Sequence, residues 1–353
     1  MLKVYAGKTA MKQLKDGGIK ADHFTTFLGA SGGPKWFTLY GLDRYLFGDF
    51  FAGRKQPLDI IGSSAGAFRA ACFAQADPVA AIERLAYDYS RTTYSDKVTP
   101  TEISSKARLL LDKMLGDTGA SEIINNSVFR AHFIVARVNG FAASENKWTQ
   151  LLGLTKSYVA NRINRRHIAS QYHRVVYQNP ASDITIGDKY DFPTEHINLS
   201  SNNLKDALLA SGSIPMVMQG IADIADSPLG MYRDGGIIDY HFDINIGSNH
   251  SLDNGLTLYP HFSHTPKAGW FDKSLKRGID PSNYDRVVMV VPSTEFVAQL
   301  PYGKIPDRED FTKMEPDQRI RYWSEVLEQT EKLADEFNNI INNVSNRVIY
   351  PID

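Results

Sequence analysis

Near the N-terminus, two short apolar runs each end in a glycine-rich turn that is followed by a segment of helical character. The first run spans residues 25–28 and its turn residues 29–34, whereas the second spans residues 58–61 and its turn residues 62–66. Small, helix-favouring residues then continue through residues 67–76. A repeated order of strand, tight turn and helix is typical of a mainly parallel sheet flanked by helices. The pattern therefore predicts an α/β fold.

The rest of the chain continues this alternation. Further apolar runs that we interpret as strands span residues 133–138, 175–177, 197–199 and 287–291. Asp77 followed by Pro78 predicts the start of a helix. The helical segment 148–168 is not required by the alternating scheme, so we interpret it as an insertion. From Ile320 to Val344 apolar residues recur in steps of three and four, which predicts one long C-terminal helix packed on its own domain.

Composition excludes several classes of protein. Lys and Arg number 39 against 40 Asp and Glu, and a net charge of −1 is not that of a dedicated nucleic-acid binder. Cys72 is the only cysteine, so an internal disulfide or a cysteine-based zinc site is not expected. The first residues lack the apolar core of a secretory signal, and no run of about 18 apolar residues predicts a membrane-spanning helix. We therefore expect a cytoplasmic protein without a transmembrane segment.

Ser64 lies at the centre of Gly62-Ser63-Ser64-Ala65-Gly66, which matches the G-x-S-x-G pattern of a nucleophilic serine. The strand before it and the helix after it are the context that this pattern requires, because the serine is then exposed on a strained turn. The N-terminus of the following helix would favour negative charge developing at the serine. An unreactive turn rich in Gly and Ser is the alternative interpretation.

The loop Gly29-Ala30-Ser31-Gly32-Gly33-Pro34-Lys35 ends the preceding strand. Because consecutive parallel strands can lie side by side, its backbone N–H groups could face Ser64 and stabilise an oxyanion. A phosphate-binding loop is disfavoured, since Pro34 separates Gly33 from Lys35 and no Ser or Thr follows the lysine.

Asp234 in Arg233-Asp234-Gly235-Gly236 is a candidate base, although an Asp-Gly hairpin turn is its plainer interpretation. Serine hydrolases usually place a histidine between serine and acid, so a histidine after Asp234 could be the base that acts on Ser64. None of these histidines lies in a motif of its own. His261 and His264 are three residues apart, but a metal site formed by this pair would lack a third ligand. These histidines are His241, His250, His261 and His264.

The glycine loop, the G-x-S-x-G serine and the Asp-Gly-Gly turn, in this order along the chain, resemble the motifs of the patatin-like phospholipase family. That family has a glycine-rich oxyanion loop ending in a basic residue, a G-x-S-x-G serine and an Asp-Gly-Gly aspartate that completes a Ser/Asp dyad without histidine. A fourth segment, Ala210-Ser211-Gly212-Ser213-Ile214-Pro215, looks like the family's Ala-Ser-x-x-x-Pro block, and the match runs from about residue 25 to residue 236. Ser31, Lys35 and Trp36 depart from the family's Gly-Gly-Gly-x-Arg-Gly loop.

The resemblance implies a three-layer α/β/α fold with a nucleophile elbow. Residues 1–353 would form one patatin-like domain with a helical insertion at 141–170, a possible lid, and a C-terminal extension at 240–353. It also implies catalysis by Ser64 and Asp234, with Gly32, Gly33 and Lys35 at the oxyanion hole and with no cofactor or metal. The expected reaction is hydrolysis of fatty-acyl esters of phospholipids or other lipids. Acyl transfer through the same dyad, and a lipid-binding or effector protein without turnover, stay open.

The insertion carries basic residues beside apolar ones. Arg162, Arg165 and Arg166 follow Leu151, Leu152 and Leu154 along the chain. A basic amphipathic helix can lie at an anionic lipid surface, although a solvated helix face packed on the core is the more common arrangement. We therefore hold these arginines as candidate substrate-binding residues and a peripheral membrane contact as a candidate partner. The oligomeric state is not predicted.

Overall fold

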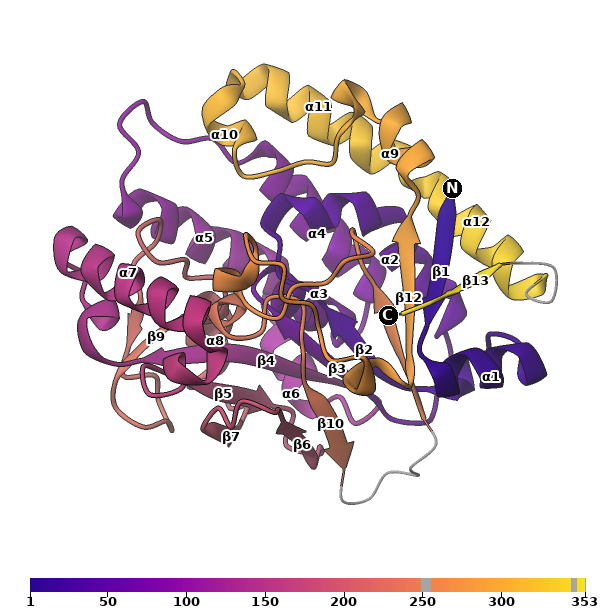
Figure 1. Ribbon diagram of the computed structural model, residues 1–353. Helices are drawn as coiled ribbons and strands as arrows, with labels where there is room; N and C mark the ends of the chain where they lie inside the picture. Colours follow the sequence, from indigo (N-terminus) through magenta and orange to yellow (C-terminus); the bar gives the residue numbers. More distant parts are fainter. Residues whose placement is uncertain (249–254, 344–347, 353) are drawn as a thin grey trace.

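The computed structural model describes residues 1–248, 255–343 and 348–352 (Figure 1). Within this part of the chain the central sheet has eleven strands, in the order β13-β1-β12-β11-β2-β3-β4-β5-β7, with β9 on β4 and β8 on β9. These strands are Leu2–Ala6 (β1), Phe24–Gly29 (β2), Leu58–Ser63 (β3), Phe129–Val138 (β4), Tyr172–Gln178 (β5), Thr194–Asn198 (β7), Ile221–Ala222 (β8), Met231–Asp234 (β9), Leu256–Pro260 (β11), Val287–Pro292 (β12) and Ile349–Pro351 (β13). Ile184–Gly187 (β6) and Asn245–Ser248 (β10) form a separate antiparallel pair.

The centre of the sheet is parallel, as the sequence predicts. Neighbouring strands from β12 through β11, β2 and β3 to β4 all run in the same direction. Antiparallel neighbours lie outside this centre, with β1 on β12 and with β5 and β9 on β4. Because the parallel strands share a direction, the carboxyl ends of β2, β3 and β4 meet at one edge of the sheet.

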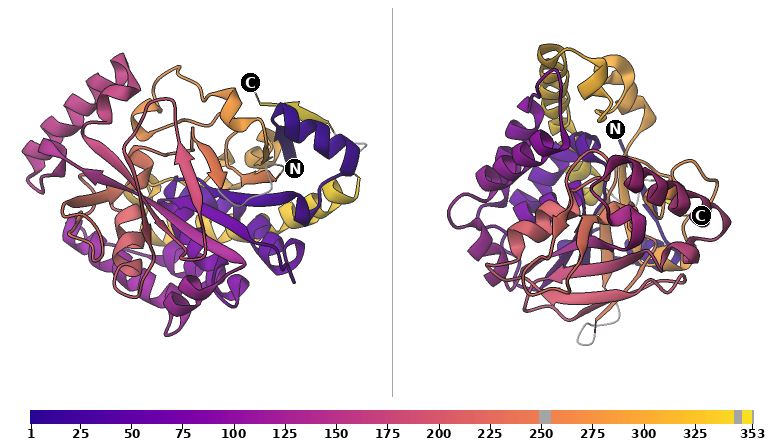
Figure 2. Two further views of the ribbon diagram at one scale, coloured as in Figure 1. Left: turned by 90° about the horizontal axis from the view of Figure 1, so that it is seen from below. Right: turned by 90° about the vertical axis from the view of Figure 1, so that its left-hand side faces the viewer.

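Successive side chains of the central strands enter two different apolar cores. Ile60 packs in a core that includes side chains of the helices on one face, whereas Ile61 packs on the other face with Phe242 and Tyr259. This alternation is what a strand buried on both faces requires. The molecule is therefore a three-layer α/β/α structure, and the left view of Figure 2 shows the sheet between its two covering layers.

The helices are distributed unequally between these layers. On the face of Ile60 lie Tyr40–Tyr45 (α2), Ala65–Phe73 (α3), Pro78–Arg91 (α4), Pro100–Leu115 (α5), Leu204–Ser211 (α8), Pro316–Gln329 (α11) and Glu331–Asn342 (α12). Lys8–Gly17 (α1), Gly119–Asn125 (α6) and Thr294–Gln299 (α9) also contribute buried side chains to this core, and Asp310–Lys313 (α10) packs against it. Lys147–Ile163 (α7), by contrast, contributes Leu154 to a third apolar core. The predicted start of α4 is confirmed, since Asp77 accepts a hydrogen bond from the Ala80 N–H at 2.9 Å.

Two expectations change in detail. The insertion is α7 followed by a short 3₁₀ turn at Arg165–Ile168. The segment expected as one long C-terminal helix is divided at Thr330 into α11 and α12. The Thr330 hydroxyl donates to the Leu327 carbonyl at 2.7 Å and accepts from the Gly41 N–H at 3.1 Å, so α2 lies directly against the backbone at the division.

No described helix combines the length and the apolar character needed to cross a bilayer.

Candidate active site

Ser64 occupies a strained turn between β3 and α3. Its φ of 55° and ψ of −124° are unusual for a residue with a side chain, and such a conformation costs about 1–3 kcal/mol. The glycines around it permit close backbone contact. A Cβ on Gly62 would lie 2.2 Å from the Gly66 carbonyl oxygen, and one on Gly66 would lie 1.7 Å from that of Gly29. The Gly-x-Ser-x-Gly spacing is thus required for α3 to begin directly against β2 and β3.

A buried ion pair anchors the helix behind this turn. Arg69 of α3 donates to both carboxylate oxygens of Asp43, at 2.8 Å and 2.6 Å, and both side chains are almost fully buried. The guanidinium also lies over the rings of Phe27 and Phe73. Cys72 is buried on the same helix, and burial raises the pKa of its thiol, so it is a packing residue rather than a nucleophile.

Asp234 lies within hydrogen-bond distance of Ser64, although 170 residues separate them in the chain. Strand β9 pairs with β4 so that Asp234 is opposite Val135. The Ser64 hydroxyl donates to Asp234 Oδ2 at 2.9 Å, and the Gly236 N–H donates to Oδ1 at 2.7 Å. Each carboxylate oxygen therefore has a partner, and Oδ2 is directed at the serine hydroxyl.

Burial raises the pKa of Asp234, and the positive charge of Arg308 together with the Ser64 and Gly236 hydrogen bonds opposes this rise. The exposed fraction is 6% for Asp234 and 3% for Ser64. A carboxylate with a raised pKa is a stronger base than an exposed one, which suits removal of a proton from a serine hydroxyl.

Ser211 fixes the backbone of the turn. Its hydroxyl accepts from the Ser64 N–H at 3.0 Å and donates to the carbonyl of Ile134 on β4 at 2.7 Å. Two residues later, the Ser213 carbonyl accepts from the Asp234 N–H at 3.0 Å. The segment at the end of α8 therefore binds both members of the Ser64–Asp234 pair.

The glycine loop after β2 lies beside this pair. Gly29 is in register with Gly62 on β3, and the Ser31 hydroxyl donates to the Ser63 hydroxyl at 3.0 Å. A Cβ on Gly236 would lie 2.7 Å from Ser31 Oγ, so the loop also contacts the Asp-Gly-Gly turn. Ser31, a departure from the expected glycine pattern, thus connects the loop to the strand that carries the nucleophile.

Gly33 has a φ of 57°, a left-handed conformation that glycine adopts without strain. Among the described residues, the structure records no hydrogen-bond acceptor for the backbone N–H of Gly32 or of Gly33. These amides have the properties of oxyanion donors, and their role stays a prediction. The Lys35 ammonium, by contrast, pairs with Asp307 at 3.1 Å.

The described histidines after Asp234 are used elsewhere. His241 and His261 are buried against each other, with ring centroids 4.3 Å apart, and the pKa of His261 falls to about 3 because of burial. His264 stacks on Tyr5. No described histidine forms a hydrogen bond with Ser64 or Asp234, and His250 lies outside the described residues.

The three candidate arginines of the insertion differ in environment. Arg165 has 2% of its surface exposed, pairs with Asp272 at 2.9 Å and donates to the Ile238 carbonyl. It holds the insertion to the C-terminal segment, and this corrects the expectation that it could contact a substrate. Arg162 is exposed, and Arg166 is exposed beside Asp191.

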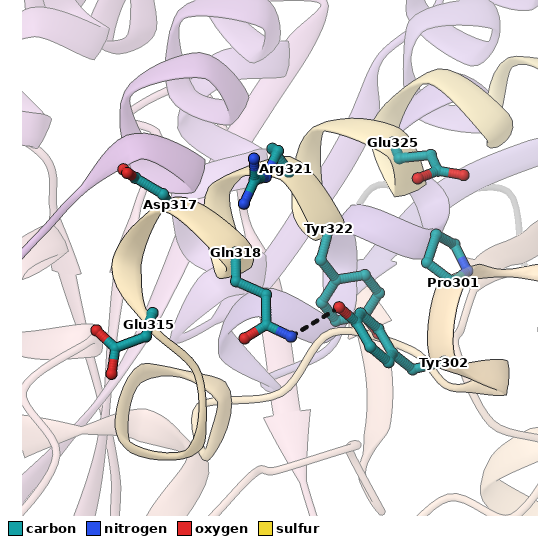
Figure 3. Close-up of a pocket in the computed structure, with 8 residues that line it drawn as sticks. All are labelled: Pro301, Tyr302, Glu315, Asp317, Gln318, Arg321, Tyr322 and Glu325. Carbon is teal, nitrogen blue, oxygen red and sulfur yellow. Dashed lines mark hydrogen bonds between the residues drawn. The ribbon is translucent and has the colours of Figure 1, made fainter.

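Metal-ligand groupings and surface hollows were the other features that could mark a site in the described part of the chain. Within the described residues, no three His, Cys, Asp or Glu side chains are grouped so as to bind a metal ion. A surface hollow beside α11 contains Tyr302 and Gln318, joined by a 2.9 Å hydrogen bond (Figure 3). Neither Ser64 nor Asp234 lines this hollow.

Comparison with known proteins identifies the family of the chain. The family model described as patatin-like phospholipase matches residues 30–241, so the chain belongs to that family. Among solved structures, one titled crystal structure of VipD from Legionella pneumophila is similar over 95% of this chain and 70% of its own, with 10% identity and a TM-score of 0.41. No curated protein sequence is significantly similar to this chain.

Proposed function

We propose that this protein is a serine acyl-ester hydrolase that cleaves fatty-acyl esters of phospholipids or related lipids. The observation that carries the proposal is the 2.9 Å hydrogen bond from the Ser64 hydroxyl to the buried carboxylate of Asp234. Membership of the patatin-like phospholipase family supports the class of substrate. A protein that only binds lipid would need neither the strained serine nor the buried carboxylate.

The proposed reaction has two halves. Asp234 accepts the hydroxyl proton while Ser64 Oγ bonds to the ester carbonyl carbon, and the N–H groups of Gly32 and Gly33 stabilise the resulting oxyanion. When the intermediate collapses, the ester C–O bond breaks and the proton passes from Asp234 to the leaving alcohol. Asp234 then accepts a proton from water as the water oxygen bonds to the acyl carbon. The bond from that carbon to Ser64 Oγ breaks, the proton passes from Asp234 back to Ser64, and the fatty acid is released.

The first test is Ser64→Ala and Asp234→Asn, assayed on phospholipids, lysolipids and neutral glycerides with released fatty acid read by mass spectrometry. Each variant should lose about 10³-fold or more of the turnover, because the two residues act as a unit. Ser64→Ala should also abolish labelling by a fluorophosphonate. His264→Ala is the control and should retain turnover, since His264 is exposed and stacks on Tyr5. Full turnover in Ser64→Ala would end the proposal.

The two alternatives predict different products. If the enzyme is an acyltransferase, adding an alcohol acceptor should divert most of the acyl group from free fatty acid to a new ester. If the protein is a binding or effector protein, wild type and Ser64→Ala should release equally little fatty acid.

The proposal includes contact of α7 with an anionic lipid surface. Trp148, Leu152 and Ile163 are 70%, 65% and 72% exposed, and Val159 is 51% exposed. No Asp or Glu occurs from residue 146 to residue 168, where five Lys and Arg are present. Apolar side chains flanked by basic ones are the pattern of a helix that lies in a membrane interface, each basic residue there contributing about 1 kcal/mol.

Sedimentation with anionic liposomes tests this contact. Trp148→Ser with Leu152→Ser, and separately Arg162→Glu with Arg166→Glu, should each reduce the bound fraction. The matched control is Leu109→Ser, which removes a 56% exposed leucine from α5 and should leave binding unchanged. Equal binding by all variants would exclude α7 as the contact.

A further inference from the structure

Two basic side chains from the C-terminal part of the chain lie close to the active-site pair. Arg308 is placed against the oxyanion loop, where a Cβ on Gly33 would be 2.9 Å from its Nε. Lys273 follows a 3₁₀ turn at Trp270–Asp272. The positive charges of both residues act on the Asp234 carboxylate. Both lie beyond residue 241, where the family match ends.

The positive charge of this group is only partly neutralised. Lys35, the third cation of the group, is paired with Asp307 at 3.1 Å. Lys273 and Arg308 form no ion pair within 4.0 Å in the described part of the chain. The oxygens of Asp234 are already engaged by Ser64 and Gly236.

Lys273 is held in a position that does not favour its charge. Its ammonium lies 4.0 Å from the centroid of the Tyr240 ring, although the residue as a whole is exposed. Removal of the ammonium from water and the nearby charge of Arg308 lower the pKa of Lys273 to about 7. A bound anion would offset both effects, because it would stabilise the charged lysine and reduce its repulsion by Arg308.

We propose that Lys273 and Arg308, together with Lys35, bind the phosphoryl group of the ester substrate beside Ser64. This inference rests on the proposed hydrolase function and names the substrate as a phosphate-bearing lipid. A planar guanidinium donates to two phosphate oxygens at once, and the ammonium groups add point charges for the others. In a glycerophospholipid only glycerol carbons separate the phosphate from the acyl esters, so the phosphate is close to the serine when an ester is attacked.

The kinetic test compares a glycerophospholipid with a diacylglycerol of the same acyl chains in mixed micelles of a neutral detergent. The variants are Arg308→Gln and Lys273→Gln, and the matched control is Lys276→Gln, an exposed lysine of the same segment. Because Arg308 also affects the pKa of Asp234, the ratio of the two kcat/KM values is the readout. The ratio of phospholipid to diacylglycerol should fall about tenfold or more in the first two variants and stay unchanged in the control. An unchanged ratio in all three variants overturns the proposal.

A binding test does not depend on turnover. In a Ser64→Ala background, glycerol 3-phosphate and inorganic phosphate are titrated by calorimetry, and Arg308→Gln should weaken glycerol 3-phosphate about tenfold or more. If neither phospholipid nor diacylglycerol is hydrolysed but this weakening is seen, the proposed hydrolysis fails and the phosphoryl site stands. Equal affinity for both probes, with an unchanged kinetic ratio, would identify a site for free phosphate and overturn the assignment to substrate.

Discussion

Replacing Ser211 by alanine removes the hydroxyl that connects the nucleophile turn to β4. The Ser64 N–H then loses its acceptor at 3.0 Å, and the Ile134 carbonyl loses a donor at 2.7 Å. Ser64 and Ser211 are 3% and 0% exposed, so water does not readily replace the lost partner. A buried polar group left without a partner costs about 1–3 kcal/mol. We therefore expect the free energy of unfolding to fall by about 2–3 kcal/mol, and kcat to fall because the strained serine is no longer held.

Ser213→Ala is the matched comparison, since Ser213 is equally buried and lies two residues away. Its hydroxyl donates to the Leu209 carbonyl, which also accepts from the Gly212 N–H, so the substitution leaves that carbonyl satisfied. We expect a loss below about 1 kcal/mol. Urea unfolding of both variants, with kcat measured on the same preparations, gives the answer. Equal losses at the two positions would refute the role assigned to Ser211.

Four further predictions concern the same site and its supports. The raised pKa of Asp234 means that kcat/KM should rise with pH through a value above 3.8, as a rate profile would show. It also means that stability declines as the pH rises through that pKa, so Asp234→Asn should be more stable than wild type to urea at about pH 8, with the difference shrinking at acid pH. Gly66→Ala should lower the free energy of unfolding by about 3 kcal/mol and should also lower the soluble yield, because its Cβ would lie 1.7 Å from the Gly29 carbonyl oxygen. A thermal unfolding curve like that of the wild type would contradict this. Arg165→Gln should cost about 1–3 kcal/mol, because it removes buried hydrogen bonds while Arg277 still pairs with Asp272 at 2.7 Å. The exposed Arg166→Gln should cost below about 1 kcal/mol, and similar urea midpoints would be evidence against the assigned burial.

The sequence was sufficient for features that depend on local pattern. The strand before Ser64 and the helix after it are confirmed, because apolar runs and glycine turns act within a few residues. The Asp-Gly-Gly turn made Asp234 a candidate base, and the family resemblance favoured that role over an ordinary turn. Its 2.9 Å contact with Ser64 depends on the pairing of β9 with β4. No local pattern distinguishes that aspartate from an ordinary turn residue.

Other parts of the site depend on long-range packing and carried no sequence signal. Lys273 and Arg308 lie in segments without a motif, and only the fold brings them to the oxyanion loop. Arg165 and Arg166 are adjacent in the chain, yet one is buried and the other exposed, which composition alone cannot separate. The strands β1 and β11 were also missed, since their short runs resemble many other stretches of the chain.

The order of strands has a consequence for how the chain folds as it is synthesised. Strand β1 pairs with β12 and β13, so the first strand to be synthesised cannot pair until the strands that begin at residues 287 and 349 have been made. Strand β2 likewise waits for β11 at residue 256 on one of its sides. Contacts between such distant residues slow folding and leave strand edges open to other chains in the meantime. A ribosome-released fragment that ends before β11 would contain Ser64 and Asp234 but only part of the sheet, and we expect it to aggregate rather than to yield a small active enzyme.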